Sequence, residues 1–132
     1  MITRLEPDTL RKTPQQYRGI YVHGTHIVSP QSLVCLSGLI GVAPDGTTQH
    51  VFLSQCHQAM DNFEALLAEA GMDMPDIMRV VYFVTDAAYL PELSALRQAR
   101  WNLGHPPAVT TLIVAGLAAP DLLDEIEVPA AK

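Results

Sequence analysis

Apolar side chains recur at intervals of three and four along residues 52–72, a pattern that predicts an amphipathic helix with one buried face. Polar residues such as Gln55 occupy the rest of its circumference. Gly71 suits the left-handed residue that closes a helix, and Pro75 opposes continuation beyond it. The apolar stripe consists of Phe52, Cys56, Ala59, Met60, Phe63, Leu66, Leu67 and Ala70. A helix of this kind needs a sheet to pack against.

Segments rich in β-branched and aromatic residues lie on both sides of this helix and predict strands. The expected strand segments are 19–24, 25–28, 33–42, 79–85, 108–115 and 122–128, with a short edge strand within 1–18. A second, less regular amphipathic helix is expected over 90–103, with Pro91 in its first turn. This order of elements predicts one α+β domain spanning residues 1–132, with two helices packed on one side of a mixed sheet.

The last strand segment alternates between acidic and apolar residues. Successive side chains of a strand point to opposite faces, so Glu125 and Glu127 share one face while Ile126 and Val128 share the other. We expect the apolar face to join the core and the other face to present two carboxylates. Taken alone, such carboxylates most often form ordinary salt bridges at a surface or interface.

Two glycines, Gly38 and Gly41, interrupt the segment 33–42. Glycine within a strand usually marks a bulge or a place where a ligand or another part of the chain approaches closely. We therefore expect a local departure from regular strand geometry here.

The composition indicates that part of the surface is covered by another subunit. Hydrophobic residues make up 48% of the 132 residues and charged residues 17%, whereas about 25% charged residues are usual for soluble domains. The net charge of −6 and the absence of any run of Lys or Arg argue against a nucleic-acid partner. No segment has the length and apolarity of a signal or membrane-spanning sequence, so we expect a soluble cytoplasmic protein.

Cysteines and histidines show no spacing typical of a metal site. Cys35 and Cys56 both lie in apolar segments, so we expect buried structural thiols. The five histidines include no pair with the spacing of metal ligands, so we expect no metal site.

From Leu33 onward the sequence resembles the reactive intermediate deaminase family, the Rid or YjgF-like proteins. The resemblance rests on an ordered set of short motifs rather than on any single one. The matching pieces are Ser37-Gly38, Gln55-x-x-Gln58-x-x-x-Asn62, Asp76-Ile77, Phe83-Val84-Thr85-Asp86, Pro107-Ala108 and Glu125-Ile126-Glu127. The resemblance implies a chorismate-mutase-like fold, a homotrimer around a barrel-like core of sheets, and a small pocket at each subunit interface.

Enzymes of this family hydrolyse enamines and imines to a keto acid and ammonia without a cofactor. By resemblance, Glu125 is the catalytic residue that positions water. The residues that the resemblance places around a small-molecule substrate are Tyr21, Ser37, Gly38, Ser94, Val109 and Thr111. Ser94 stands where the family has an asparagine, and Thr111 where it has a cysteine.

The chain departs from the family pattern at Val109, which stands where the family has the arginine that binds the substrate carboxylate. Loss of a charge-assisted bidentate contact weakens carboxylate binding by roughly a hundredfold or more. Three explanations remain open: the substrate has no carboxylate, another cation such as Arg97 or Arg100 replaces the arginine, or the chemistry is lost. In the last case the chain is a non-catalytic homotrimeric module that binds a metabolite or a partner protein.

Overall fold

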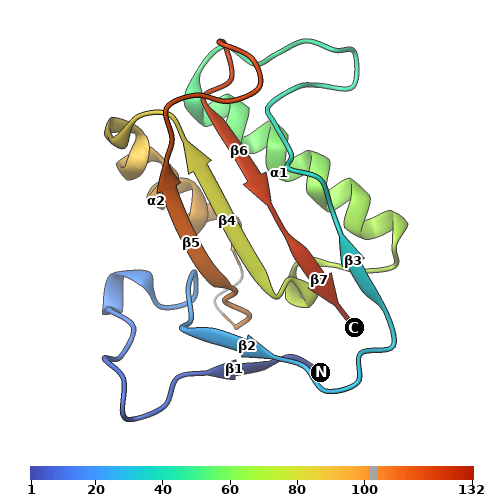
Figure 1. Cartoon of the computed structure of the whole chain (residues 1–132), viewed down its shortest axis with the longest axis vertical. Helices are drawn as coiled ribbons and strands as arrows, with labels where there is room; N and C mark the ends of the chain where they lie inside the picture. The colour runs from blue at the N-terminus through green and yellow to red at the C-terminus, as the bar shows by residue number, and fades with distance from the viewer. Residues whose placement is uncertain (102–103) are drawn as a thin grey trace.

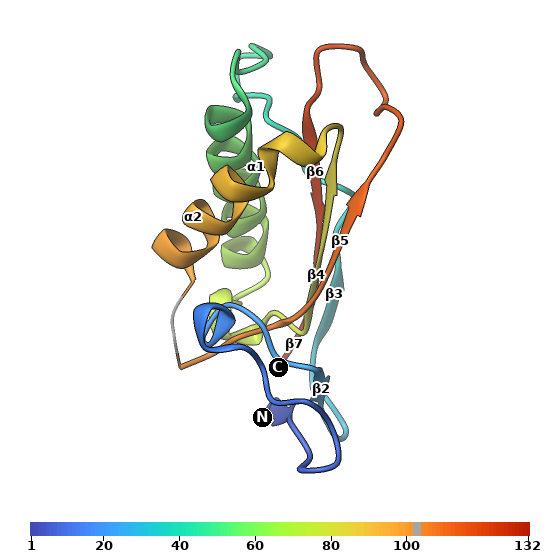
Figure 2. The same ribbon diagram turned by 90° about the vertical axis from the view of Figure 1, so that its left-hand side faces the viewer.

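Both helices cover the same face of a mixed β-sheet in the computed structural model of this chain, which describes residues 1–101 and 104–132 (Figure 1). The view along the sheet places the two helices together on one side and leaves the other side of the strands bare (Figure 2). This arrangement confirms the expected α+β class.

The elements follow the chain in the order β1 (Thr3–Leu5), η1 (Gln15–Tyr17), β2 (Gly24–His26), β3 (Leu33–Cys35), α1 (Phe52–Glu69), η2 (Met74–Asp76), β4 (Arg79–Val84), η3 (Ala87–Tyr89), α2 (Leu90–Arg100), β5 (Ala108–Ile113), β6 (Asp124–Glu127) and β7 (Pro129–Ala131). The η elements are single turns of 3₁₀-helix.

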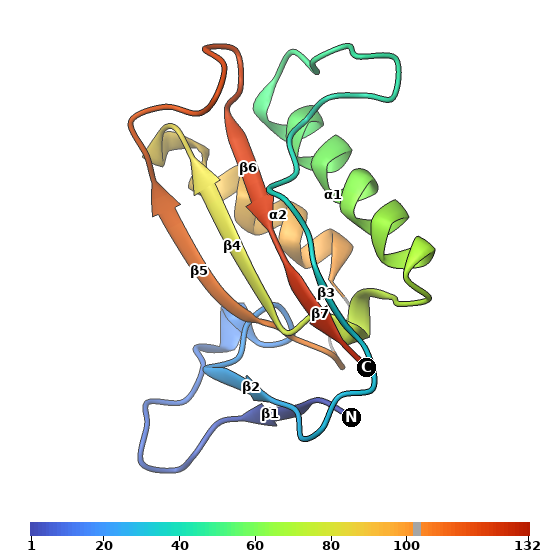
Figure 3. The same ribbon diagram turned by 45° about the vertical axis from the view of Figure 1, so that its right-hand side comes forward.

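Strand β4 lies between β5, to which it is parallel, and β6, to which it is antiparallel. Tyr82 at its centre stands opposite Thr111 on one side and Ile126 on the other. Strand β7 continues β6 and pairs with β3, while β1 and β2 form a separate antiparallel pair (Figure 3). The sheet therefore presents one row of residues to the helices and the next row to the bare side.

Helix α1 ends as the sequence predicts: Gly71, at φ +70°, adopts the left-handed conformation beyond its last turn. The expected stripe is correct in its centre but wrong at two edges, because Leu66 and Ala70 are exposed. Gln55, expected on the polar side, is fully buried. Its amide satisfies backbone groups of two neighbouring loops, which accounts for a polar side chain in that position.

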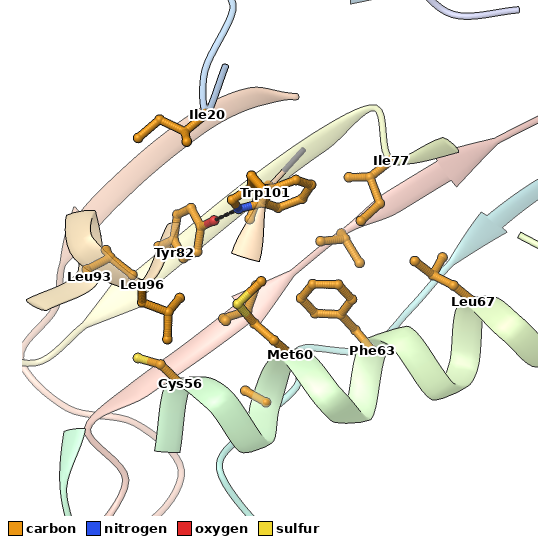
Figure 4. Close-up of a cluster of buried hydrophobic side chains, with 14 of the residues drawn as sticks. Ile20, Cys56, Met60, Phe63, Leu67, Ile77, Tyr82, Leu93, Leu96 and Trp101 are labelled. Carbon is orange, nitrogen blue, oxygen red and sulfur yellow. Dashed lines mark hydrogen bonds between the residues drawn. The ribbon is translucent and has the colours of Figure 1, made fainter. Parts of the chain in front are cut away.

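Helix α2 ends at Arg100, and Trp101 continues in an extended conformation. Its indole packs into the core and donates a hydrogen bond from Nε1 to the Tyr82 hydroxyl at 2.9 Å (Figure 4). The last two residues of the helix expected over 90–103 lie outside the described residues. The hydrophobic core surrounds Trp101 and Tyr82, and Phe63 and Met60 of α1 face β4 within it.

The segment expected as one strand over 33–42 is shorter and contains the predicted irregularity. Only β3 is regular strand, with Cys35 opposite Pro129, and Leu39 then pairs with Ile126. Leu39 lies four positions after Cys35, whereas Ile126 lies only three positions before Pro129, so the segment carries one extra residue, as in a β-bulge. Gly38 lies within it.

The structure corrects one further expectation, completes another and bears on a third. Cys35 is exposed rather than buried, because β3 lies at the edge of its sheet, whereas Cys56 is buried as expected. Strand β7 extends the sheet beyond the expected end at residue 128. Among the described residues, neither helix has both the length and the apolar character needed to cross a membrane.

Candidate functional site

The Glu125 carboxyl rests directly on Gly38. A Cβ atom added to Gly38 would lie 2.6 Å from the Glu125 Cδ and 2.8 Å from its Oε2, closer than any side chain can approach. The absence of a side chain at residue 38 therefore creates the space that the carboxyl occupies. Ser37 precedes this glycine and is exposed.

Glu125 points to the bare face of the sheet. It stands opposite Phe83 of β4, which in turn stands opposite Leu112 of β5, and its neighbours Asp124 and Ile126 point toward the helices and are buried. Within the described part of the chain, Glu125 forms no salt bridge, and no group donates a hydrogen bond to it. A half-buried carboxylate with unused acceptors is suited to orienting a water molecule or a donor on a ligand.

Ser94 and Thr111 meet in a different place, a pocket of about 260 Å³ between α2 and β5. The pocket lies on the helix side of the sheet because Thr111 shares a row with the buried Tyr82. It is lined by Tyr17, Leu90, Leu93, Ser94, Arg97, Thr111 and Ile113. Three hydroxyl-bearing residues and one arginine thus line a space large enough for a small metabolite.

Val109 lies two residues before Thr111 on the same face of β5, opposite Val80 of β4. Its side chain packs against the hydrophobic core instead of lining the pocket. An apolar residue is therefore well accommodated there. The expectation that Val109 and Thr111 share a face agrees with the register of β5.

The two arginines of α2 have different surroundings. Arg100 donates from Nη2 to Asp61 at 2.8 Å and to Glu64 at 3.0 Å, and these contacts with α1 raise its pKa despite the opposing effect of burial. Arg97 is 7% exposed and donates from Nη2 to the Ile20 carbonyl at 3.2 Å. Only Arg97 lines the pocket.

Tyr21 lies apart from both groups of residues. It lines a separate pocket with Arg4, Glu6 and Arg18, and its hydroxyl is 2.6 Å from Nδ1 of His23. The tyrosine beside Ser94 and Thr111 is Tyr17, at the end of η1. The sequence offered one signal for it, an aromatic residue in an otherwise polar segment.

Asp124 is a buried acid that the sequence did not single out. It is 2% exposed, its side chain lies near the Cys56 thiol, and neither carboxyl oxygen has a hydrogen-bond partner among the described residues. Burial raises its pKa to about 7, and the same burial raises the pKa of Cys56. A thiol in that state is a poor nucleophile, in keeping with the structural role expected for it.

The predicted site residues thus form two groups on opposite faces of the sheet. Ser37, Gly38 and Glu125 belong to the bare face, whereas Ser94 and Thr111 belong to the pocket under α2. Because the sheet formed by β5, β4 and β6 lies between the two groups, a small ligand cannot contact both of them within one subunit. In the ranges 1–101 and 104–132, no three acidic, His or Cys side chains are grouped so as to hold a metal ion.

Comparison with known proteins gives three consistent matches. The family model described as endoribonuclease L-PSP matches residues 14–132. A RutC family protein of Aquifex aeolicus is 30% identical over 107 residues, which cover 80% of this chain and 85% of that one. The crystal structure of the YjgF gene product of E. coli is 30% identical with a TM-score of 0.71, covering 86% of this chain and 89% of that one.

One solved structure follows the fold more completely. YyfB from Yersinia pestis, described as a protein of unknown function of the conserved Rid family, has a TM-score of 0.83 and covers 99% of this chain and 98% of its own. Its sequence identity is 24%, so this likeness is one of fold.

Proposed function

Because the chain belongs to the endoribonuclease L-PSP family, which includes the Rid, YjgF and RutC proteins, we propose that it hydrolyses a small imine or enamine without a cofactor. Its fold is the chorismate-mutase-like α+β fold of the YjgF proteins, as expected. In this proposal the protein acts in the cytoplasm as a homotrimer, with Glu125 as the catalytic residue.

The observation that carries the proposal is the Glu125 carboxyl held against Gly38. Its oxygens accept no hydrogen bond from any other described residue, so they can accept one from water. The close contact with Gly38 limits where the carboxyl can lie. A carboxylate with unused acceptors, positioned beside Phe83, has the features needed to orient one water molecule.

The proposed reaction requires only a positioned proton acceptor from the protein, because the imine carbon is already electrophilic. An enamine first tautomerises to its imine, and Glu125 accepts a proton from water as the water oxygen bonds to the electrophilic imine carbon. That proton passes to nitrogen to give a carbinolamine. Glu125 then moves the hydroxyl proton to the amino group, and the carbon–nitrogen bond breaks as the carbon–oxygen double bond forms, so that a carbonyl compound and ammonia leave. Proton transfer to a positioned side chain contributes a factor of about 10² to 10⁴.

The separation of the two groups of residues favours a pocket shared by two copies of the chain. One copy would supply Ser37, Gly38 and Glu125 from its bare face, and the next would supply Ser94 and Thr111. The outer end of β5 is apolar and uncovered, with Leu112 43% and Ile113 49% exposed. An uncovered apolar edge strand favours a protein partner, here a second copy.

The family description mentions ribonuclease activity, which we do not extend to this chain. RNA binding depends on clustered cations that replace the counterions of phosphate groups. This chain has 8 Lys and Arg against 14 Asp and Glu, and Arg100, one of the 8, is already paired with acids.

The alternative is a non-catalytic homotrimeric module that binds a metabolite or a partner protein in the same interface pocket. The observation that favours it is Val109, which packs into the core where the family has a carboxylate-binding arginine. A site without that arginine can retain the shape of the pocket and lose the reaction.

One experiment separates the two functions. Imines are generated in the assay by an amino-acid oxidase, a carboxylate-free imine is supplied in parallel, and hydrolysis is followed with and without the protein. Catalysis predicts acceleration that is lost in Glu125→Gln and retained in Glu127→Gln, which removes the exposed acid two residues along the same face. Acceleration that persists in Glu125→Gln, or a monomer in sedimentation, contradicts the proposal. A folded trimer that accelerates neither imine supports the binding module.

A further inference from the structure

Arg97 is a buried cation without an acidic partner. Its side chain is 7% exposed, and among the described residues no Asp or Glu lies within ion-pair distance of it. Nη2 donates to the Ile20 carbonyl, and the buried Nε has no hydrogen-bond partner within residues 1–101 and 104–132. Removing a charge from water costs free energy unless the charge is paired. Binding of an anion beside this guanidinium would offset that cost.

The neighbouring arginine shows how the chain pairs a cation when the pairing is structural. Arg100, one turn further along α2, is shared between Asp61 and Glu64 of α1 and also lies 3.1 Å from Nδ1 of His57. These contacts join the two helices. Arg97 takes part in no such contact, although it is more deeply buried.

Tyr82 lies beneath Arg97 but does not neutralise it. The guanidinium carbon is 5.2 Å from the centre of the Tyr82 ring, a cation–π distance. Burial raises the pKa of Tyr82 to about 12 despite the opposing effects of Arg97 and of the hydrogen bond from Trp101, so the phenol is neutral at pH 7. The ring holds the guanidinium in place and leaves its positive charge unbalanced.

The pocket beside Arg97 has the chemistry of a site for a small acid. Three residues that carry hydroxyl groups, Tyr17, Ser94 and Thr111, line it, none of its described lining residues is acidic, and its volume is about 260 Å³. Hydroxyls can donate to a carboxylate oxygen, and Arg97 supplies the charge. Leu90 and Ile113 provide apolar walls for a short carbon chain.

We propose that this pocket binds the carboxylate of the substrate through Arg97, which supplies from α2 the cation that is absent from β5 at Val109. The substrate class is then a small 2-imino or 2-enamino acid rather than a carboxylate-free imine. This inference rests on the proposed function for the reaction, and its binding claim stands on the pocket alone.

Direct binding measurements test it on the intact protein. Pyruvate and its neutral amide have nearly the same shape, and titration calorimetry compares their affinities. We expect pyruvate to bind about tenfold or more tightly than the amide, since a desolvated charged contact is worth at least that factor. The preference is lost in Arg97→Gln and kept in Arg100→Gln, the matched control on the same helix. Equal affinity of the wild-type protein for acid and amide overturns the inference.

A second variant covers the case in which Arg97→Gln fails to fold. Thr111→Asp leaves Arg97 and its packing on Tyr82 in place and adds a carboxylate to the same pocket. The added carboxylate pairs with Arg97 and repels the ligand, so pyruvate binding weakens about tenfold or more relative to Thr111→Asn, an uncharged variant of similar size that also replaces the hydroxyl. Circular dichroism verifies that each variant is folded. Undiminished pyruvate binding in Thr111→Asp contradicts the inference.

Turnover separates a failure of this inference from a failure of the proposed function. Hydrolysis of a carboxylate-free imine that requires Glu125, with no preference for pyruvate over its amide, upholds the reaction and refutes the role of Arg97. A clear preference for pyruvate without hydrolysis of any imine upholds Arg97 as a carboxylate-binding residue and refutes the reaction.

Discussion

The two faces of β6 carry acids with opposite surroundings. Asp124 points under α1, where it is 2% exposed and its oxygens have no hydrogen-bond partner among the described residues. Glu125 points to the bare face and lies on Gly38. Adjacent positions of one strand thus hold an acid whose pKa burial raises to about 7 and an acid that remains accessible to water. The covered face belongs to the fold, and the bare face is available for chemistry.

Two glycines repeat this contrast. A Cβ atom on Gly38 would meet the end of the Glu125 side chain, which can move. A Cβ atom on Gly41 would lie 2.4 Å from Cα of Gln55, part of the backbone of α1, which cannot move without disturbing the helix. The same residue type therefore serves the site in one position and the packing of a helix in the other.

The largest expected effect is on the bare face. Glu125→Gln keeps the size of the side chain and removes its ability to accept a proton, so we expect imine hydrolysis to fall by about 10² to 10⁴. The free energy of unfolding should change by less than about 0.5 kcal/mol, because Glu125 forms no hydrogen bond or salt bridge with another described residue. Rate measurements and denaturant titration on the same sample check both. A large loss of stability would place Glu125 in the fold instead.

On the covered face, Asp124 predicts a dependence of stability on pH. Its folded pKa of about 7 lies above its ordinary value of 3.8, so the folded state binds the proton more tightly. The resulting stabilisation is complete below about pH 4 and is lost as the pH rises through 7, by at most about 4 kcal/mol.

Asp124→Asn, which resembles the protonated acid, should remove that contribution. The measurement is the difference in free energy of unfolding between wild type and variant at pH 4, 5.5 and 7, which cancels the other titrating groups. The variant should gain relative to the wild type as the pH rises. A difference that does not change with pH would show that Asp124 is ionised in the folded protein.

Gly41→Ala tests the packing of α1 on the bulged segment. The added methyl group meets the backbone of Gln55, and we expect a loss of about 3 kcal/mol in the free energy of unfolding, as for other overpacked sites. Gly116→Ala is the matched control, since a Cβ atom there has no neighbour within 4 Å, and it should change stability by about 0.5 kcal/mol or less. Equal losses in the two variants would contradict the distinction.

The smallest effect is expected for Gly38→Ala. The methyl group displaces the Glu125 carboxyl, so the rate should fall about tenfold through misplacement of the acceptor. Stability should fall by about 1 kcal/mol or less, because a side-chain end can move aside. Comparing this variant with Gly41→Ala shows whether the two glycines differ as the contacts suggest. Stability lost to the same extent in both would remove the difference between them.

Much of this fold follows from local patterns in the sequence. The period of α1, its end at Gly71 and the alternation in β6 are properties of short segments, and the structure agrees with each. Strand β7 was missed because Pro-Ala-Ala has little intrinsic preference for strand structure, and pairing with β3 decides its conformation.

The candidate site depends more on contacts between distant segments. Tyr17 joins Ser94 and Thr111 only because the N-terminal segment returns to the edge of β5. Whether Arg97 or Arg100 is the unpaired cation depends on the positions of Asp61 and Glu64 on α1, about 40 residues earlier in the chain. Residue spacing along α2 gives both arginines the same pattern, so it could not distinguish them.

The buried amide of Gln55 has a consequence for the order in which the chain folds. It donates to the carbonyls of Gln49 and Asp121 and accepts from the amide of Leu123, so its three bonds form only when both loops have reached α1. Closing so long a stretch of chain is an entropically costly and late event. Exchange of the Leu123 amide hydrogen with solvent should therefore report the opening of that whole stretch rather than the fraying of a single loop.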